Sequence, residues 1–262
     1  MDSYGNAYIV DNDHKSRFRV LKVSSEGKQL DEWRVFPVVE GRSGGPDGIA
    51  MDFQGNILVT DNGKLRVLKL SPEGKLLMSI GGDAPLFHDL GHVAADSKGN
   101  IYVAEGGQHR IQKFSSTGKR IAVWQGPQGR VSGAEEWKMP ETIVSRSDDS
   151  LVVDDWGNRR IVVLSPNGHV RFIINRTESR SDAGICVDRT GDIYALDWKQ
   201  HLIRKFDPKG RPVSTISDSE RNVLFTEDPS SLAVDAAGNF YAADGLSIVK
   251  FSPQGKLLAR WR

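Results

Sequence analysis

Apolar and polar positions along this chain form short strands separated by tight turns, and the arrangement recurs through the whole sequence. The stretch from His92 to Trp124 shows it clearly, because apolar runs of three to five residues alternate with polar corners containing Gly-Asn or Thr-Gly. Short runs rich in β-branched and aromatic residues, bounded by turn residues, are typical of strands. The runs are too short and too closely spaced for helices, so this stretch predicts four antiparallel strands.

Two turns recur six times each, in phase with one another. The first turns are Gly5-Asn6, Gly55-Asn56, Gly99-Asn100, Asp149-Ser150, Gly191-Asp192 and Gly238-Asn239. The second turns are Gly27-Lys28, Gly74-Lys75, Gly118-Lys119, Gly168-His169, Gly210-Arg211 and Gly255-Lys256. A repeat of about 40–50 residues with four strands per unit is typical of propeller blades. We therefore expect an all-β fold, a six-bladed β-propeller of four-stranded antiparallel blades that forms a single domain over residues 1–262.

The amino-acid sequence of the repeated units resembles the NHL repeat. It is carried by Gly48-Ile-Ala-Met-Asp52, by Gly99-Asn-Ile-Tyr-Val-Ala-Glu105 and by His109-Arg-Ile-Gln-Lys-Phe114, and it covers essentially the whole chain. The resemblance implies a β-propeller, commonly six-bladed. The fourth unit departs most, since Asp149-Ser150 replaces Gly-Asn, but its later strands keep the apolar pattern and it is counted as a blade.

The first unit lacks its beginning. Met1-Asp2 aligns with Met51-Asp52, so the innermost strand of blade 1 is missing while its other three strands are present. The chain stops where the fourth strand of blade 6 should end, which leaves no spare strand there. We expect either a piece of a longer protein or a first blade with only three strands.

Composition narrows the class of protein without choosing a function. The 262 residues are 38% hydrophobic and 26% charged, with a formal net charge of +1, which fits a folded globular chain and does not indicate nucleic acid or an anionic membrane. No apolar run approaches the roughly 20 residues that span a bilayer. Cys186 is the single cysteine, so no intramolecular disulfide can form, and its apolar strand predicts a buried thiol.

The longer connections between strands are the expected location of any site. In an up-and-down blade, the links after strands two and four share one face, and here those after strand four are long and varied. They are residues 38–46, 82–91, 125–140, 175–183 and 218–229. Because function tends to lie on variable loops held by a rigid scaffold, we place the site on this face, around the central channel.

Polar residues where the innermost strands begin suggest one candidate site. Asp47, His92 and Glu141 come from three consecutive blades and converge on the axis, where they could bind one divalent metal. Oxygen ligands suit Ca²⁺ or Mg²⁺, and histidine favours Zn²⁺. Six-bladed lactonases and lyases are similar in placing polar ligands there, so a metal-dependent hydrolase or lyase is one alternative. The simpler interpretation is that these residues cap strand ends and bind channel water.

Aromatic and basic residues near the connections suggest another candidate. Trp137, Trp156 and Trp198, with Arg159, Arg160 and Lys199, could anchor a protein or small ligand on the connection face. The simpler interpretation is that the tryptophans pack between blades and the arginines pair with nearby acids. We adopt a non-catalytic binding platform without a cofactor as the first hypothesis, and expect a monomer because propeller edges are short and protected.

Single-stranded RNA is a further alternative, since some NHL proteins bind RNA on this face through basic and aromatic side chains. Acidic residues outnumber basic ones on the long connections, which argues against it. An acid also recurs at the end of the second strand, at Asp11, Asp61, Glu105, Asp154, Asp197 and Asp244. Because it recurs in every unit, we assign it to the fold, as a partner for the corner backbone or for Arg66, Arg110 or Arg159, and assign His109 to the fold as well.

Overall fold

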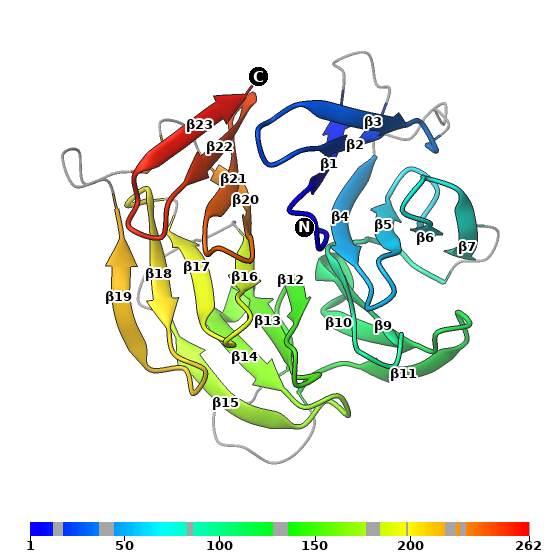
Figure 1. The fold of residues 1–262 in the computed structure, drawn as a ribbon. Helices are drawn as coiled ribbons and strands as arrows, with labels where there is room; N and C mark the ends of the chain where they lie inside the picture. Colours follow the sequence, from blue (N-terminus) through cyan, green and yellow to red (C-terminus); the bar gives the residue numbers. More distant parts are fainter. Residues whose placement is uncertain are drawn as a thin grey trace.

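A computed structural model of the protein describes residues 1–12, 18–36, 45–82, 86–127, 136–176, 184–197, 199–217, 224–225 and 229–261. Six antiparallel sheets stand around a central axis like the blades of a propeller (Figure 1). Five sheets have four strands and the first has three. The expected all-β six-bladed propeller, with its innermost strand missing from blade 1, is therefore confirmed.

The strands follow the blades in chain order. Blades 1 to 3 contain β1 (Ala7–Asn12), β2 (Phe18–Val23), β3 (Gln29–Trp33), β4 (Pro46–Met51), β5 (Ile57–Asp61), β6 (Arg66–Leu70), β7 (Leu76–Gly81), β8 (Val93–Ala95), β9 (Ile101–Glu105), β10 (Arg110–Phe114) and β11 (Arg120–Trp124). Blades 4 to 6 contain β12 (Pro140–Ser145), β13 (Leu151–Asp155), β14 (Arg160–Leu164), β15 (Val170–Asn175), β16 (Ile185–Val187), β17 (Ile193–Asp197), β18 (Leu202–Phe206), β19 (Pro212–Ile216), β20 (Pro229–Val234), β21 (Phe240–Asp244), β22 (Ser247–Phe251) and β23 (Leu257–Trp261). The described residues form only two short 3₁₀ turns besides the strands, η1 (Gly106–Gln108) and η2 (Trp156–Asn158). No helix in this part of the chain is long and apolar enough to cross a membrane.

An aspartate organises the first turn of most blades. Asp96 accepts hydrogen bonds from the backbone of Lys98 and Asn100 and from the hydroxyl of Tyr102, which donates at 2.9 Å. Gly99 completes the turn with φ at 77°, a value that glycine adopts without steric cost. Asp2 makes the same contacts in blade 1, accepting from the backbone of Tyr4 and Asn6. The first turn of blade 1 is thus formed although no strand precedes it.

The core lies between neighbouring blades. Each hydrophobic cluster combines residues of two adjacent sheets, as when Val152 and Ile161 of blade 4 pack with Ile185 and Ile193 of blade 5. The second strand of blades 2 to 5 is buried along its whole length, because it is covered on both faces and paired on both edges. Cys186 is free and buried in the cluster between blades 5 and 6, and burial raises the pKa of its thiol, as an inert structural cysteine requires.

The recurring acid at the end of the second strand pairs with an arginine, as expected. Asp61 pairs with Arg66 at 2.8 Å and Glu105 with Arg110 at 2.6 Å, and each carboxylate is buried at the corner of its blade. Blade 4 corrects the sequence alignment, because β13 runs to Asp155, one residue beyond the predicted Asp154. Asp155 pairs with Arg160 at 2.7 Å, whereas the predicted Arg159 is exposed.

Candidate binding face

The connections after the second and fourth strands lie at the same end of the blades, around one mouth of the axis. The corners between second and third strands are closed by residues with left-handed backbone conformation, which is uncommon outside glycine. These are Leu65 (φ 51°), His109 (φ 52°), Arg159 (φ 54°) and His201 (φ 53°), one from each of blades 2 to 5. The same backbone conformation therefore presents leucine in blade 2, histidine in blades 3 and 5, and arginine in blade 4.

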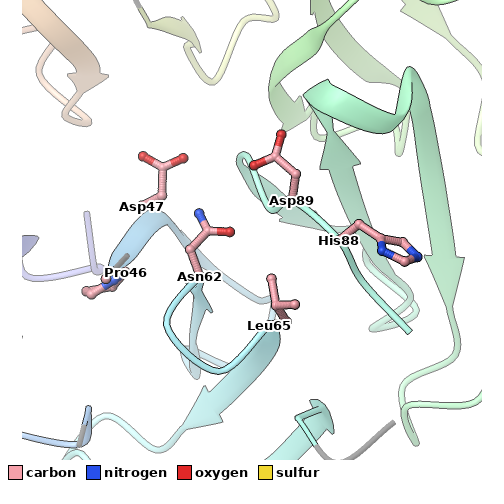
Figure 2. Close-up of a pocket in the computed structure, with 7 residues that line it drawn as sticks. Pro46, Asp47, Asn62, Leu65, His88 and Asp89 are labelled. Carbon is pink, nitrogen blue, oxygen red and sulfur yellow. The ribbon is translucent and has the colours of Figure 1, made fainter. Parts of the chain in front are cut away.

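A pocket of about 410 Å³ opens on this face between blades 2 and 3. Its walls come from the start of β4, the β5–β6 corner and the connection that leads to β8, and are formed by Gly45, Pro46, Asp47, Asn62, Leu65, His88 and Asp89. Figure 2 shows Asp47, Asn62 and Asp89 directed toward one open space, while the imidazole of His88 is turned away. The pocket thus offers two carboxylates and one amide to a ligand.

The pocket wall is fixed by hydrogen bonds between the two blades. Asn62 donates from Nδ2 to the carbonyl of Leu90 (2.6 Å) and accepts from the Leu90 N–H (2.8 Å). Asp89 accepts from the N–H of Gly107 (2.8 Å), which ties the connection to η1. Asn62 and Asp89 were not singled out from the sequence as site residues, because nothing in a single unit shows that one blade's corner meets the next blade's connection.

Asp47 and His92 influence each other at the channel mouth. Partial loss of hydration raises the pKa of Asp47, the charge of His92 opposes this change, and Asp89 adds to it. Burial lowers the pKa of His92, against the attraction of Asp47. Asp47 is exposed, so water screens the effect on its carboxylate. Both changes favour neutral side chains, and groups perturbed in this way often mark functional sites.

Glu141, the third residue of the predicted metal site, lies toward the neighbouring η1 turn. Its Oε1 would be 2.7 Å from a Cβ placed on Gly106, and its backbone carbonyl accepts the N–H of His92 at 3.0 Å. Among the described residues, no group of three or more His, Cys, Asp or Glu side chains is arranged to hold a metal ion. The structure therefore associates Asp47 with His92 but does not form the predicted trio.

The corner of blade 4 is held by several hydrogen bonds. Lys138 donates its N–H to Asp155 (2.8 Å) and accepts that of Gly157 (2.7 Å), while Asn158 donates to the carbonyl of Glu136 (2.8 Å). The other end of this segment reaches blade 3, where Nδ1 of His109 accepts the N–H of Met139 at 3.0 Å. Residues 136–139 therefore link two blades, and His109 serves the fold as expected.

The structure separates the predicted anchor residues into different environments. Trp156 is half-buried on η2, and Arg159 and Lys199 are exposed. Trp137 is only 3% exposed and packs in the core cluster between blades 3 and 4, so the expectation of an exposed anchor is wrong for this residue. Arg160 is also buried, since it neutralises Asp155, and Trp198 lies outside the described residues.

Comparisons with known proteins agree with this architecture. Residues 5–85 match the family model described as SMP-30/Gluconolactonase/LRE-like region. A stretch of 110 residues is 29% identical to peptidyl-alpha-hydroxyglycine alpha-amidating lyase 1 of Drosophila melanogaster, covering 38% of this chain and 20% of the relative. Another of 85 residues is 32% identical to human NHL repeat-containing protein 2, covering 28% of this chain and 12% of the relative. The match therefore spans a fifth or less of the curated relatives' length.

The chain folds as a six-bladed β-propeller, and parts of its sequence are similar to SMP-30/gluconolactonase-like and NHL-repeat proteins. Solved structures show the same fold across almost its full length. The streptogramin B lyase structure superposes with a TM-score of 0.70 at 16% identity, covering 99% of this chain and 82% of the lyase chain. A chain of the nidogen/laminin complex gives the same TM-score and identity, covering 94% and 90%. The fold is thus shared by an enzyme and by a chain of a protein complex, and does not choose between these roles.

Proposed function

We propose that this NHL-like propeller is a non-catalytic binding platform whose connection face holds a protein segment. The observation that carries the proposal is the corner of blade 4, where a half-buried Trp156 stands beside an exposed Arg159 on a hydrogen-bonded turn. Tryptophan and arginine are enriched among residues that dominate binding energy. A surface that is already rigid loses little conformational entropy when a partner docks, which favours affinity.

The charges around this corner indicate the chemistry of the partner. Arg159, Lys138 and Lys199 are exposed on blades 4 and 5, whereas the pocket between blades 2 and 3 presents Asp47 and Asp89. A peptide with an aromatic or aliphatic anchor and neighbouring acidic residues would complement the blade 4 corner. We expect the platform to act as a monomer, and a nucleic acid is disfavoured because the pocket side of the same face would repel phosphate.

A phage-displayed peptide library selected on the immobilised protein tests the proposal. Enriched peptides should lose about tenfold or more in affinity for Trp156→Ala, on the order of 1.4 kcal/mol. They should bind normally to Lys209→Ala, a control at an exposed turn on the opposite face. Both variants should keep the wild-type circular dichroism spectrum. No enrichment, or equal affinity for both variants, would contradict a binding role for this corner.

A metal-dependent hydrolase or lyase is the second candidate, supported by the opposite pKa changes of Asp47 and His92. Carboxylate and imidazole groups held near neutrality can exchange protons with a substrate. The relative and the solved structure named as lyases are consistent with such a role, although each carries its own activity. Elemental analysis should then find about one equivalent of Ca, Mg or Zn in wild type and in Asp31→Asn, and less in Asp47→Asn. A metal-free wild-type protein would count against this candidate.

A further inference from the structure

The first and second turns of the blades lie together at the end of the disc opposite the connection face, and we call this end the turn face. It comprises residues 2–6, 24–28, 52–56, 71–75, 96–100, 115–119, 146–150, 165–169, 188–192, 207–211, 235–239 and 252–256. The two turns of one blade touch, since a Cβ on Gly99 would lie 3.1 Å from Cβ of Ser116. Turns of neighbouring blades also touch, where Ser97 donates its N–H to Asp149 at 2.7 Å.

Side chains join the turn face across the blade boundaries. Lys250 of blade 6 donates to the carbonyl of Ser25 in blade 1 (3.1 Å), and Nε1 of Trp261 donates to that of Glu26 (3.1 Å). Side chains of blades 3 and 4 likewise donate to a carbonyl in the second turn of the next blade. The turns therefore form one surface, which is already ordered before any partner docks.

Basic side chains are exposed on the turn face in every blade. Each second turn carries one directly after its glycine, and these residues are Lys28, Lys75, Lys119, His169, Arg211 and Lys256. Lys98, Arg189 and Lys209 are exposed in the same turns. The exposed acids of these turns are fewer, namely Glu26, Glu73 and Asp148. The turn face therefore has an excess of positive charge.

The aspartates that organise the first turns do not cancel this charge, because lysines inside the blades pair with them. Asp52 lies 2.7 Å from Nζ of Lys69, and Asp2 lies 3.8 Å from that of Lys22. In contrast, no ion pair within the described residues involves the exposed lysines at positions 28, 75, 98, 119, 209 and 256. The formal net charge of +1 does not reveal this surface, because it is summed over the whole chain.

Two aromatic side chains project from the same face, in the first turns of the adjacent blades 1 and 2. Tyr4 is 87% exposed and Phe53 is 82% exposed, more than any other large hydrophobic residue in the described part of the chain. The equivalent positions in the other blades hold only serine, lysine, aspartate, arginine, threonine or alanine. Because the two rings add nothing to the core, they indicate contact with something outside the fold.

We propose that the turn face docks onto membranes whose surface carries anionic phospholipids. Tyr4 and Phe53 enter the headgroup region, where aromatic rings are favoured, and the lysines lie against lipid phosphates. A charged plane can engage basic residues of all six blades at once, whereas a single strand of peptide or nucleic acid can reach only some of them. The attachment is peripheral and leaves the connection face directed away from the membrane.

Co-sedimentation with vesicles tests the proposal. At about 0.1 M salt, the chain should bind phosphatidylcholine vesicles containing about 30% phosphatidylserine roughly tenfold or more tightly than vesicles of phosphatidylcholine alone. Higher salt should weaken the binding, because it screens the charges. Lys75→Glu combined with Lys119→Glu should weaken it by roughly tenfold or more, since each lysine contributes to the attraction. Lys64→Glu combined with Lys199→Glu makes the same change in net charge at exposed positions of the connection face and should bind like wild type.

Phe53 tests the aromatic part of the proposal separately from the charges. Phe53→Ala should weaken binding to the anionic vesicles by about threefold or more while leaving the salt dependence unchanged. Phe53→Trp should bind like wild type, because an indole is also favoured at the membrane interface. All variants should keep the wild-type circular dichroism spectrum, since each altered side chain is exposed.

Four results would overturn the proposal. They are equal binding to the two kinds of vesicle, equal losses in the two charge-reversed pairs, unchanged binding of Phe53→Ala, and tighter binding to a single-stranded oligonucleotide than to the anionic vesicles at the same salt concentration. The last result would assign the turn face to a nucleic acid. None of these measurements involves the connection face, so their failure leaves the proposed peptide binding intact.

Discussion

Asn62 holds the backbone of Leu90 with both ends of its side-chain amide, donating to the carbonyl at 2.6 Å and accepting from the N–H at 2.8 Å. The contact joins the β5–β6 corner of blade 2 to the connection that enters blade 3. Leu90 is buried, so its backbone groups have no access to water as a substitute partner. One amide therefore fixes the junction of blades 2 and 3 beside the polar pocket.

Replacing this amide should destabilise the fold and loosen the pocket. Asn62→Ala leaves two backbone groups unsatisfied, and we expect a loss of about 2–4 kcal/mol in the free energy of unfolding. Asn62→Asp should also destabilise, because an ionised carboxylate cannot donate to the Leu90 carbonyl. Urea denaturation measures both, with Lys209→Ala as a surface control expected to stay within about 0.5 kcal/mol of wild type. An alanine variant as stable as the control would contradict the assigned role.

The seam between blades 6 and 1 can be tested with a matched pair of glycines. Gly27 and Gly55 have nearly equal φ, 84° and 82°, so alanine is strained by a similar amount at either position. A Cβ on Gly27 would lie 1.7 Å from Nε1 of Trp261, whereas one on Gly55 meets nothing closer than 4.0 Å.

We therefore expect Gly55→Ala to cost about 1–2 kcal/mol from backbone strain alone. Gly27→Ala should lower the free energy of unfolding by roughly 1–3 kcal/mol more, because the Trp261 indole must move away from blade 1. Thermal and urea unfolding provide the comparison, and tryptophan fluorescence should report a changed indole environment only in Gly27→Ala. Equal costs for the two variants would show that Trp261 does not hold the seam.

The Asp155–Arg160 pair gives a prediction about pH. Burial raises the pKa of Asp155, and hydrogen bonds from Asn158, the Lys138 N–H and Arg160 oppose this change. Arg160→Met removes the arginine, so the folded-state pKa should rise further above the unfolded value. The folded variant then binds more protons than the unfolded chain, and its stability should fall as pH increases through the folded pKa.

At neutral pH we expect Arg160→Met to lose about 3–5 kcal/mol, as for a buried charge without its partner. The loss should shrink as pH decreases toward the ordinary pKa of an aspartate, because Asp155 can then fold in its neutral form. The exposed Arg171–Asp148 pair is the control, and Arg171→Met should cost no more than about 1 kcal/mol. A loss for Arg160→Met that does not change with pH would contradict this account of Asp155.

Trp137 and Trp156 should respond differently to truncation. Trp137 fills the core between blades 3 and 4, so Trp137→Ala should cost about 3–5 kcal/mol. Trp156 is half-buried, so Trp156→Ala should lower the free energy of unfolding by clearly less. Among the described residues neither indole N–H has a hydrogen-bond partner, so phenylalanine should be tolerated better than alanine at both positions. Differential scanning calorimetry of the four variants measures the ranking, and equal losses for the two alanine variants would contradict it.

The sequence predicted the fold because the information is local and repeated. Turn pairs such as Gly99-Asn100 and apolar strands such as 101–104 specify one blade, and the alignment of Met1-Asp2 with Met51-Asp52 predicted the three-stranded first sheet. The register of blade 4 was predicted one residue short, since Asp154 and Asp155 are both acidic and only the pairing of β13 with β14 selects the second.

The candidate site depends on contacts between units, which a repeat alignment does not contain. Trp137 lies in a connection without apolar periodicity, so its burial became visible only when blades 3 and 4 were placed together. The hydrogen bonds between Asn62 and Leu90 likewise depend on how blades 2 and 3 are placed side by side. Asp47 and His92 could be predicted as neighbours, because both begin inner strands that converge on the axis.

The side-chain contacts of Trp261 and Lys250 between blades 6 and 1 also affect how the molecule should unfold. A propeller whose first and last blades share a strand resists opening equally around its circumference, whereas here one junction depends on an indole and a lysine. Heat or force should open the disc at that junction, after which the blades form a linear stack in which each depends only on its neighbours. Unfolding should then proceed away from the opened junction, and blades 3 and 4, on the far side of the ring, should be among the last to lose their structure.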